Sequence, residues 1–304
     1  MRKRKLFLWI FLALTILNIL VFFSRDRFRY QSYTDYSSLY APCDRKCYDT
    51  WSGLAKDVPT DELLIAKKIS DSFLIEHAGT YSRVLRIGNF LYNRFHNQLG
   101  SPGAALQGAT PLQQFRLLSA NDSLELWCNN FAQMFSMFCW SQDIVCRTIE
   151  VLNPGDHHVL NECYLPETKK WMVVDLTSNL LSISIRGQLA NFIDSRKAAK
   201  DGVNMEAMIS AGDSINSKKV EWTQGNIPVY YKDDLPLYFY HTVNLEKVYG
   251  WQNKIRSYLT PVSWYDIFRE KGGNNLPFYL KQVLIVLWIA SFFVFLGSRT
   301  KFRS

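Results

Sequence analysis

The central helix of this 304-residue chain is predicted by the segment Leu126-Trp-Cys-Asn-Asn-Phe-Ala-Gln-Met-Phe-Ser-Met-Phe138. Its large apolar residues recur at helical spacing and form one stripe: Phe131, Met134, Phe135 and Phe138. Cys128 stands three residues before this stripe, at the expected helix N-terminus, where unpaired N–H groups and the helix dipole favour a thiolate. Because a cysteine on an apolar helix face is usually a packing residue, Cys128 needs support from other residues to be a candidate nucleophile.

Three segments that follow this helix are predicted to be antiparallel strands. They are rich in Val, Ile, Tyr and Trp, are separated by turn residues, and cover residues 144–152, 158–165 and 171–177. His158 begins the second strand, and Asp175 ends the apolar run of the third, where a carboxylate is costly to bury without a partner. An imidazolium at His158 would be such a partner, and the carboxylate would orient the ring. A thiol, an imidazole and a carboxylate in this order predict thiolate nucleophilic catalysis.

Other interpretations of these residues stay open at this point. His157 points to the opposite face of its strand and is the alternative base. Asp175 precedes a polar turn sequence, so its carboxylate has turn capping as an alternative role. A metal site made of Cys128, His157 and His158 is a third hypothesis, although the compact spacing typical of zinc ligands is missing from the sequence. No cofactor is expected.

Two further helices are predicted before the cysteine helix, at residues 61–77 and 81–96, because apolar side chains recur there at helical spacing. Residues 99–110 contain glycines and a proline and are predicted to form a loop. Residues 182–273 mix polar, helix-like pieces such as 186–200 with aromatic clusters such as Val229-Tyr-Tyr, and their role is not assigned. The pattern as a whole predicts an α+β fold in which the cysteine helix packs on an antiparallel sheet.

The six cysteines are consistent with an oxidising compartment. Cys43 and Cys47 are close in sequence and have no histidine near them, which favours a disulfide over two free thiols or a metal site. Cys139, Cys146 and Cys163 fall at a helix end and in two strand patterns. There a cysteine is ordinarily a small buried apolar residue, and a cross-strand bridge between the last two is the alternative.

Two apolar runs predict membrane spans. The first covers residues 6–23, or 18 residues, and the second covers 278–297, or 20 residues, with Lys281 expected to snorkel toward the interface. A cleaved signal peptide is the alternative for the first run, but no small-x-small cleavage site follows it, which favours a retained anchor. A buried helix of a soluble domain is the alternative for the second run.

The net charge of +8 comes from the two tails and the second span: Arg2, Lys3, Arg4, Lys5, Lys281, Arg299, Lys301 and Arg303. The region between the spans is therefore neutral, which argues against nucleic acid as a partner. Positive residues beside a span favour the cytoplasmic side. Both termini are therefore expected in the cytoplasm, and the roughly 250 residues between the spans are expected outside it.

Four blocks in a fixed order carry a resemblance to a known family: Trp127-Cys-Asn-Asn-Phe-Ala-Gln-Met-Phe-Ser-Met-Phe-Cys-Trp, Asp143-Ile-Val-Cys-Arg147, His158-Val-Leu-Asn-Glu-Cys-Tyr-Leu165 and Trp171-Met-Val-Val-Asp-Leu-Thr177. They resemble the core of the transglutaminase-like superfamily of papain-type cysteine enzymes, in a membrane-anchored, bacterial-type form. The resemblance covers residues 61–180 and implies a papain-like α+β core flanked by two transmembrane helices. It also implies that Cys128 is the nucleophile, His158 the general base and acid, and Asp175 the residue that orients His158.

The sequence departs from the family pattern in two places. Leu126 and Trp127 stand where a small residue or glycine commonly precedes the nucleophile, and Asp143-Ile-Val-Cys-Arg147 stands where Gly-Ile-Pro-Ala-Arg is common. Neither change removes one of the three catalytic residue types. The Cys128 backbone N–H is the natural donor of an oxyanion hole. Four side chains are candidates for the second donor: Gln107, Gln113, Gln114 and the Trp127 indole.

These observations predict the following organisation: cytoplasmic tail 1–5, transmembrane helix 6–23, extracytoplasmic linker 24–60, transglutaminase-like core 61–180, extracytoplasmic extension 181–277, transmembrane helix 278–297 and cytoplasmic tail 298–304. The expected function is that of a membrane-anchored cysteine enzyme that forms an acyl-thioester on Cys128. Hydrolysis would make it a protease or amidase, and acyl transfer to an amine would make it a transglutaminase. Its expected substrate is an extracytoplasmic protein, peptide or glycan-linked amide. The alternative is a non-catalytic, membrane-anchored interaction protein with the same fold.

Overall fold

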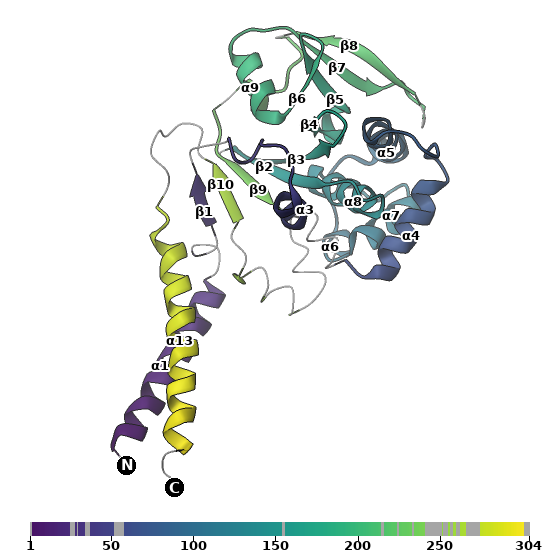
Figure 1. The fold of residues 1–304 in the computed structure, drawn as a ribbon. Helices are drawn as coiled ribbons and strands as arrows, with labels where there is room; N and C mark the ends of the chain where they lie inside the picture. Colours follow the sequence, from purple (N-terminus) through teal and green to yellow (C-terminus); the bar gives the residue numbers. More distant parts are fainter. Residues whose placement is uncertain are drawn as a thin grey trace.

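The computed structural model of the protein describes residues 2–24, 28, 30–33, 37–51, 58–153, 156–213, 216–223, 225–232, 234–240, 251, 255, 258, 259, 262–265 and 274–300. These residues form an α+β fold with two sheets, carried on a stalk of two long helices (Figure 1). The predicted α+β class is therefore confirmed.

The larger sheet has six strands in the order β1-β10-β9-β2-β3-β4. Its strands are β1 (Tyr30–Tyr33), β10 (Val262–Tyr265), β9 (Leu237–Tyr240), β2 (Cys146–Asn153), β3 (Asp156–Leu165) and β4 (Lys170–Val174). All neighbours run antiparallel except β1 and β10, which are parallel. The three predicted strands are present as β2, β3 and β4. The last of them ends at Val174, because Asp175 already begins the 3-10 turn η3 (Leu176–Ser178).

Helix α8 (Cys128–Ser141) packs against β2 and β3, and other helices surround its remaining sides: α4 (Thr60–Asp71), α5 (Thr80–Phe95) and α7 (Pro111–Ala120). Every residue of α8 from Asn130 to Ser141 is buried, so the predicted apolar stripe is only part of a helix that is covered all round. Helix α4 ends six residues before the predicted limit of 77. The predicted loop also contains one short helix, α6 (Ala104–Gln107).

Helix α7 was not among the predicted elements, although its start follows ordinary capping chemistry. Thr110 and Gln113 form a capping box in which each side chain accepts the other's backbone N–H, and Pro111 occupies the first turn. Its buried side chains, Leu112, Phe115 and Leu118 among them, join the core around α8.

The second sheet has the order β6-β5-β7-β8, with strands β6 (Gln188–Ala190), β5 (Ser182–Ile185), β7 (Met205–Ser210) and β8 (Ser217–Trp222). Helices α9 (Phe192–Lys200) and α10 (Val229–Lys232) pack beside it and share a second apolar core. The helix-like piece expected from residue 186 begins only at Phe192. The reason is that Arg186 and Gly187 have positive φ angles of 51° and 77° and form the turn of the β5–β6 hairpin.

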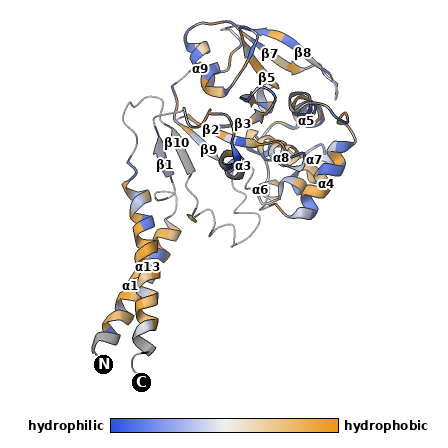
Figure 2. Ribbon diagram, in the orientation of Figure 1, coloured by the Kyte–Doolittle hydropathy of each residue, from blue (hydrophilic) through white to orange (hydrophobic). Residues whose placement is uncertain are grey.

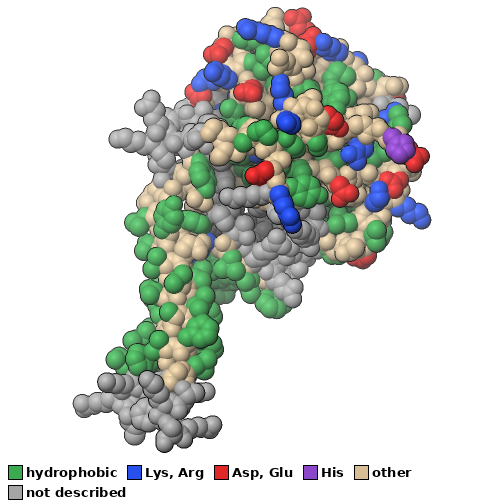
Figure 3. Space-filling view, viewed as in Figure 1, with side chains coloured by type: hydrophobic (Ala, Val, Ile, Leu, Met, Phe, Trp, Pro, Cys, Tyr) green, Lys and Arg blue, Asp and Glu red, His purple; other side chains and the backbone are tan. Residues whose placement is uncertain are grey.

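The stalk consists of α1 (Arg2–Phe23) and α13 (Leu276–Thr300), which lie side by side with the two chain termini at the same end (Figure 1). Phe11 contacts the rings of Trp288, Phe292 and Phe295, and Trp288 Nε1 donates to Thr15 Oγ1 at 2.8 Å. Both helices are long and apolar enough to cross a membrane. Figures 2 and 3 show their apolar surface, in contrast to the mixed charges over the rest of the described molecule.

Lys281, in the second of these helices, is buried and does not snorkel as predicted. Its side chain is 0% exposed, and its Nζ donates to the backbone oxygen of Tyr258 at 2.6 Å. The same ammonium lies 5.1 Å from the ring centroid of Tyr258 and 4.9 Å from that of Phe278. A carbonyl and two aromatic rings thus compensate the charge at the start of the helix.

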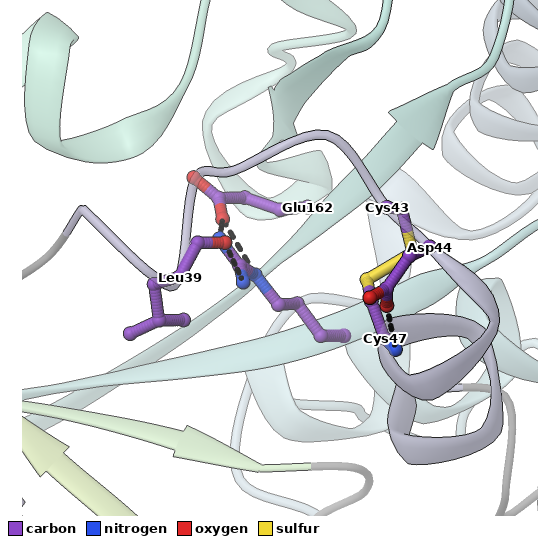
Figure 4. The surroundings of a disulfide bond; sticks show 6 residues. Leu39, Cys43, Asp44, Cys47 and Glu162 are labelled. Carbon is purple, nitrogen blue, oxygen red and sulfur yellow. Dashed lines mark hydrogen bonds and ion pairs between the residues drawn. A yellow bond between two sulfur atoms is a disulfide. The ribbon is translucent and has the colours of Figure 1, made fainter.

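Residues 37–51 pack against side chains of β2, β3 and β4 in the larger sheet. They include α3 (Arg45–Trp51) and the Cys43–Cys47 disulfide, which confirms that prediction (Figure 4). The backbone oxygen of Leu39 accepts from Arg147 on β2 at 2.9 Å, and Arg147 is paired with Glu162 on β3. This contact joins the N-terminal segment to the strands that also carry the candidate site.

Candidate functional site

Cys128 is the first residue of α8 and is partly exposed. The turn before it is held by Asn130, whose Oδ1 accepts from the Trp127 backbone N–H at 2.9 Å. The Asn130 amide then donates to Gln114 Oε1 at 3.1 Å, and Gln114 donates to Gln133 Oε1 at 2.9 Å. These amides are buried, so they fix the start of the helix and with it the position of the thiol.

Strand β3 is tied to α8 by a second buried amide. Asn161 Nδ2 donates to the backbone oxygen of Ala132 at 3.3 Å and to Ser136 Oγ at 3.0 Å, both on α8. Three residues earlier on the same strand stands His158. The helix that carries the thiol and the strand that carries the imidazole are therefore locked together by hydrogen bonds as well as by apolar packing.

The His158 ring lies between Cys128 and Asp175. Its Nε2 is 2.9 Å from Asp175 Oδ2, and its side chain is 15% exposed while that of Asp175 is 0% exposed. The Cys128 sulfur raises the pKa of the same ring, and the thiol donates to the backbone oxygen of His157 at 3.8 Å. Because Asp175 occupies Nε2, the ring nitrogen left for the thiol is Nδ1.

The electrostatics of this group favour a charged imidazole. Burial alone would lower the pKa of His158, but the Asp175 carboxylate and the Cys128 sulfur outweigh it and raise this pKa from 6.5 to about 10. Burial would likewise raise the pKa of Asp175, but the His158 ring, the Tyr230 hydroxyl and the Ser178 N–H lower it. Both shifts favour an imidazolium–carboxylate pair at neutral pH.

Asp175 fills both of the roles that the sequence left open. Its Oδ1 accepts the backbone N–H of Ser178 at 3.4 Å and caps the 3-10 turn, while Oδ2 binds His158. The turn also brings the backbone of Asp175 opposite that of Leu180, with hydrogen bonds of 2.8 Å in both directions. Turn capping thus fixes the carboxylate that holds the histidine.

Tyr230, on α10, is a member of this group that sequence reasoning missed. Its hydroxyl donates to Asp175 Oδ2 at 2.5 Å, and its ring stacks on that of His158 with centroids 3.9 Å apart. The only signal in the sequence was the aromatic cluster at residues 229–231, in a region without an assigned role.

The structure keeps His157 apart from this group. Its side chain is 62% exposed, and its Nδ1 pairs with Glu150 Oε1 at 2.8 Å. His158, rather than His157, is therefore the histidine that lies between Cys128 and Asp175. The metal site suggested for Cys128 with both histidines does not assemble, because the two rings point in different directions.

The three remaining cysteines form a buried cluster between α8 and the sheet. Cys139, Cys146 and Cys163 are free thiols, are 0% exposed, and have sulfur atoms within 4.8 Å of one another. Cys146 lies directly opposite Cys163 on β2 and β3, but no bridge joins them. Their predicted burial is thus confirmed. Burial in the apolar core raises the pKa of Cys139 and Cys163, as expected for unreactive thiols.

Two of the four side chains considered for an oxyanion hole donate their amide N–H groups elsewhere. Gln107 Nε2 donates to the backbone oxygen of Pro102, and Gln114 Nε2 donates to Ala109 and Gln133. Gln113 is held by its Oε1, which accepts the Thr110 N–H in the capping box of α7. Trp127 differs, because it is 50% exposed and directly precedes Cys128. Among the described residues, the backbone N–H of Cys128 has no acceptor.

Comparisons with models of protein families, with curated proteins and with solved structures found no match to this chain.

Proposed function

We propose that the protein is a cysteine enzyme of transglutaminase-like type in which Cys128, His158 and Asp175 act together. The observation that carries this proposal is the contiguous order of the three side chains: the thiol beside the ring, and the ring 2.9 Å from a fully buried carboxylate. An imidazolium held beside a thiol stabilises the thiolate, which is the nucleophilic form. A merely structural histidine would not need a buried carboxylate on one side and a partly exposed thiol on the other.

In the proposed reaction the Cys128 thiolate attacks the carbonyl carbon of an amide or ester and forms a C–S bond. The tetrahedral intermediate collapses, the bond from carbon to the leaving nitrogen or oxygen breaks, and His158 gives its proton to that leaving atom. An acyl-thioester remains on Cys128. His158 then takes a proton from water or an amine, which attacks the thioester carbonyl and releases the Cys128 thiolate.

The start of α8 supplies the natural site for the developing oxyanion. The N–H of Cys128 has no acceptor in the part of the chain that the structure describes, and it lies at the helix N-terminus, where the dipole also favours negative charge. We assign the second donor to the Trp127 indole, since Trp127 is half exposed and directly precedes Cys128. Gln107 and Gln114 donate elsewhere, and Gln113 is held by its oxygen in the capping box of α7.

A papain-like core is the finer fold assignment that we attach to this proposal. Two features support it: α8, which starts at the proposed nucleophile, packs on β2 and β3, and the histidine and aspartate come from β3 and the end of β4. Sequence order along the chain is cysteine, histidine, aspartate, as in the family that the sequence resembles.

We also propose that the enzyme is anchored in the membrane by α1 and α13, with both termini cytoplasmic and the catalytic part outside. Support comes from the antiparallel packing of the two apolar helices and from the basic residues at their terminal ends. The Cys43–Cys47 disulfide fits an oxidising compartment. An extracytoplasmic protein, peptide or glycan-linked amide is the substrate class consistent with this placement.

The proposal is tested by the rate at which iodoacetamide alkylates Cys128 in the full-length chain in detergent micelles near neutral pH. Peptide mapping should find Cys128 alkylated much faster than Cys139, Cys146 and Cys163, and His158→Ala should remove most of that advantage. His157→Ala is the matched control and should alkylate like the wild type. Slow alkylation of Cys128 that neither histidine variant changes would reject catalysis and favour the interaction protein.

A further inference from the structure

Tyr230 makes two contacts with the candidate site that are independent of each other. Its hydroxyl donates to Asp175 Oδ2 at 2.5 Å, the same oxygen that lies 2.9 Å from His158 Nε2. Its ring lies over the His158 ring with centroids 3.9 Å apart and planes inclined by 25°. We propose that Tyr230 is a positioning residue that holds both the imidazole and the carboxylate in their working geometry. This inference rests on the function proposed above.

The stacking of Tyr230 on His158 restrains tilting of the imidazole ring, which its hydrogen bond to Asp175 alone does not prevent. A single bond from Nε2 to Oδ2 holds one point of the imidazole, so the ring could still tilt about that point. A second aromatic ring packed nearly parallel to it opposes the tilt and covers one face from water. The nitrogen that faces Cys128 therefore keeps its direction toward the sulfur.

The hydroxyl contact acts on the charge of Asp175. One carboxylate oxygen receives hydrogen bonds from both Tyr230 and His158, so the phenol takes up part of the negative charge that would otherwise act on the imidazolium alone. Burial and the nearby Asp175 raise the pKa of Tyr230 well above 10, so the phenol keeps its proton. Ser178 Oγ lies 2.5 Å from the phenol oxygen and supports it from the other side, as a donor to Tyr230.

The residue next to Tyr230 explains how one helical turn can hold it in place. Tyr231 is fully buried and packs against Phe192 at 4.9 Å and Trp222 at 5.1 Å between ring centroids. Its hydroxyl has no hydrogen-bond partner among the described residues. Tyr231 thus anchors α10 in the second core, while Tyr230 reaches the site. Part of the region 181–277 accordingly serves the catalytic centre.

The test compares two alkylating reagents on full-length protein in detergent micelles. Iodoacetate is an anion and is attracted by the imidazolium, whereas iodoacetamide is neutral, so the ratio of their rates at Cys128 reports the charge on His158. The ratio is measured from about pH 6 to about pH 12, and its midpoint marks the loss of the His158 proton. Tyr230→Phe keeps the ring and removes the hydroxyl, and Tyr231→Phe makes the same change one residue away where no hydrogen bond is lost.

We expect Tyr230→Phe to move the midpoint upward by about one pH unit. Without the phenol hydrogen bond, the full negative charge of the Asp175 carboxylate stabilises the imidazolium. Tyr231→Phe should keep the wild-type midpoint. Tyr230→Leu, which also loses the stacked ring, should lower the iodoacetate rate near neutral pH by roughly tenfold.

A purely structural role for Tyr230 would change the folded fraction and leave the midpoint unmoved. Coincident profiles for Tyr230→Phe and Tyr231→Phe, both matching the wild type, would overturn the inference while the proposed function stands. A wild-type Cys128 with no preference for iodoacetate would instead reject the thiolate–imidazolium pair itself, and the role of Tyr230 with it. Near-ultraviolet circular dichroism of each variant separates these outcomes from unfolding.

Discussion

His158 and Asp175 are joined by a 2.9 Å contact between Nε2 and Oδ2, at a place where the carboxylate is completely buried. A buried carboxylate is stable only with partners that carry or share charge. Here those partners are the imidazole, a phenol and a backbone N–H. The pair therefore determines the charge of the histidine beside the candidate nucleophile.

Asp175→Asn should lower the reactivity of Cys128 toward iodoacetate. The change keeps the shape of the side chain but removes the charge that raises the pKa of His158 from 6.5 to about 10, while the burial that lowers this pKa remains. At about pH 8, the imidazolium population should fall by roughly 30-fold or more, and the alkylation rate with it. Asp201→Asn, at an exposed helix end, is the control and should react like the wild type. An unchanged alkylation rate in Asp175→Asn would show that the Asp175 carboxylate does not affect the reactivity of the Cys128 thiol.

The stability of the protein should depend on pH in a way that His158 controls. Its folded-state pKa is raised, so the stability it contributes is fully present below about pH 6.5 and is lost as the pH rises toward about 10. The slope within this window should reach up to about 1.4 kcal/mol per pH unit. Asp175 has a lowered pKa, so its contribution is present above its unfolded value of 3.8 and is lost only below it.

Denaturant unfolding of the wild type and of His158→Gln, followed from about pH 5 to about pH 9, measures this effect. The free energy of unfolding of the wild type should fall as the pH rises from about 6.5 to about 9. That of His158→Gln should change much less with pH. Parallel curves for the two proteins would mean that the proton on His158 does not contribute to folding.

The buried pair of Arg147 and Glu162 should be far more important for stability than a surface pair. Arg147 Nη2 lies 2.6 Å from Glu162 Oε2, both side chains are 0% exposed, and the guanidinium is 3.8 Å from the centroid of the Trp171 ring. Arg147→Met leaves Glu162 charged and buried, so we expect a loss of about 3–5 kcal/mol in the free energy of unfolding. Chemical denaturation monitored by tryptophan fluorescence provides the measurement.

The matched control is the exposed pair of Lys67 and Asp71, whose side chains are 50% and 52% exposed. Lys67→Met should cost no more than about 0.5 kcal/mol, since an exposed helical pair contributes little. Equal effects of the two substitutions would show that residues 37–51 and the Arg147 pair do not stabilise the sheet as described.

Local patterns were sufficient to predict the centre of the site. The apolar stripe after Cys128 predicts a helix, alternation places His158 and His157 on opposite strand faces, and Asp175 stands out as a carboxylate in an apolar run. Each of these three patterns can be recognised in a short stretch of sequence, without knowledge of distant residues. The structure brings the three side chains together because α8, β3 and β4 are neighbours along the chain as well as in space.

Contacts between distant segments could not be predicted in the same way. Tyr230 stands 55 residues after Asp175, on a single helical turn too short for a periodic pattern. Strand β9 joins the larger sheet beside β2 from a still more distant position in the sequence. Lys281 was expected to snorkel, since hydropathy does not reveal that the Tyr258 carbonyl lies next to its ammonium. In every case the missing information is the packing of one segment against another.

In the proposed reaction Cys128 forms an acyl-thioester with help from His158. Its most direct test is to expose the full-length protein in detergent micelles to p-nitrophenyl acetate, quench with acid, and locate the acetyl group by mass spectrometry of peptides. We expect one acetyl group on Cys128, formed much more slowly in His158→Ala. If the acceptor is an amine, added primary amine should speed its loss. Acetylation that avoids Cys128, or that His158→Ala leaves unchanged, would contradict it.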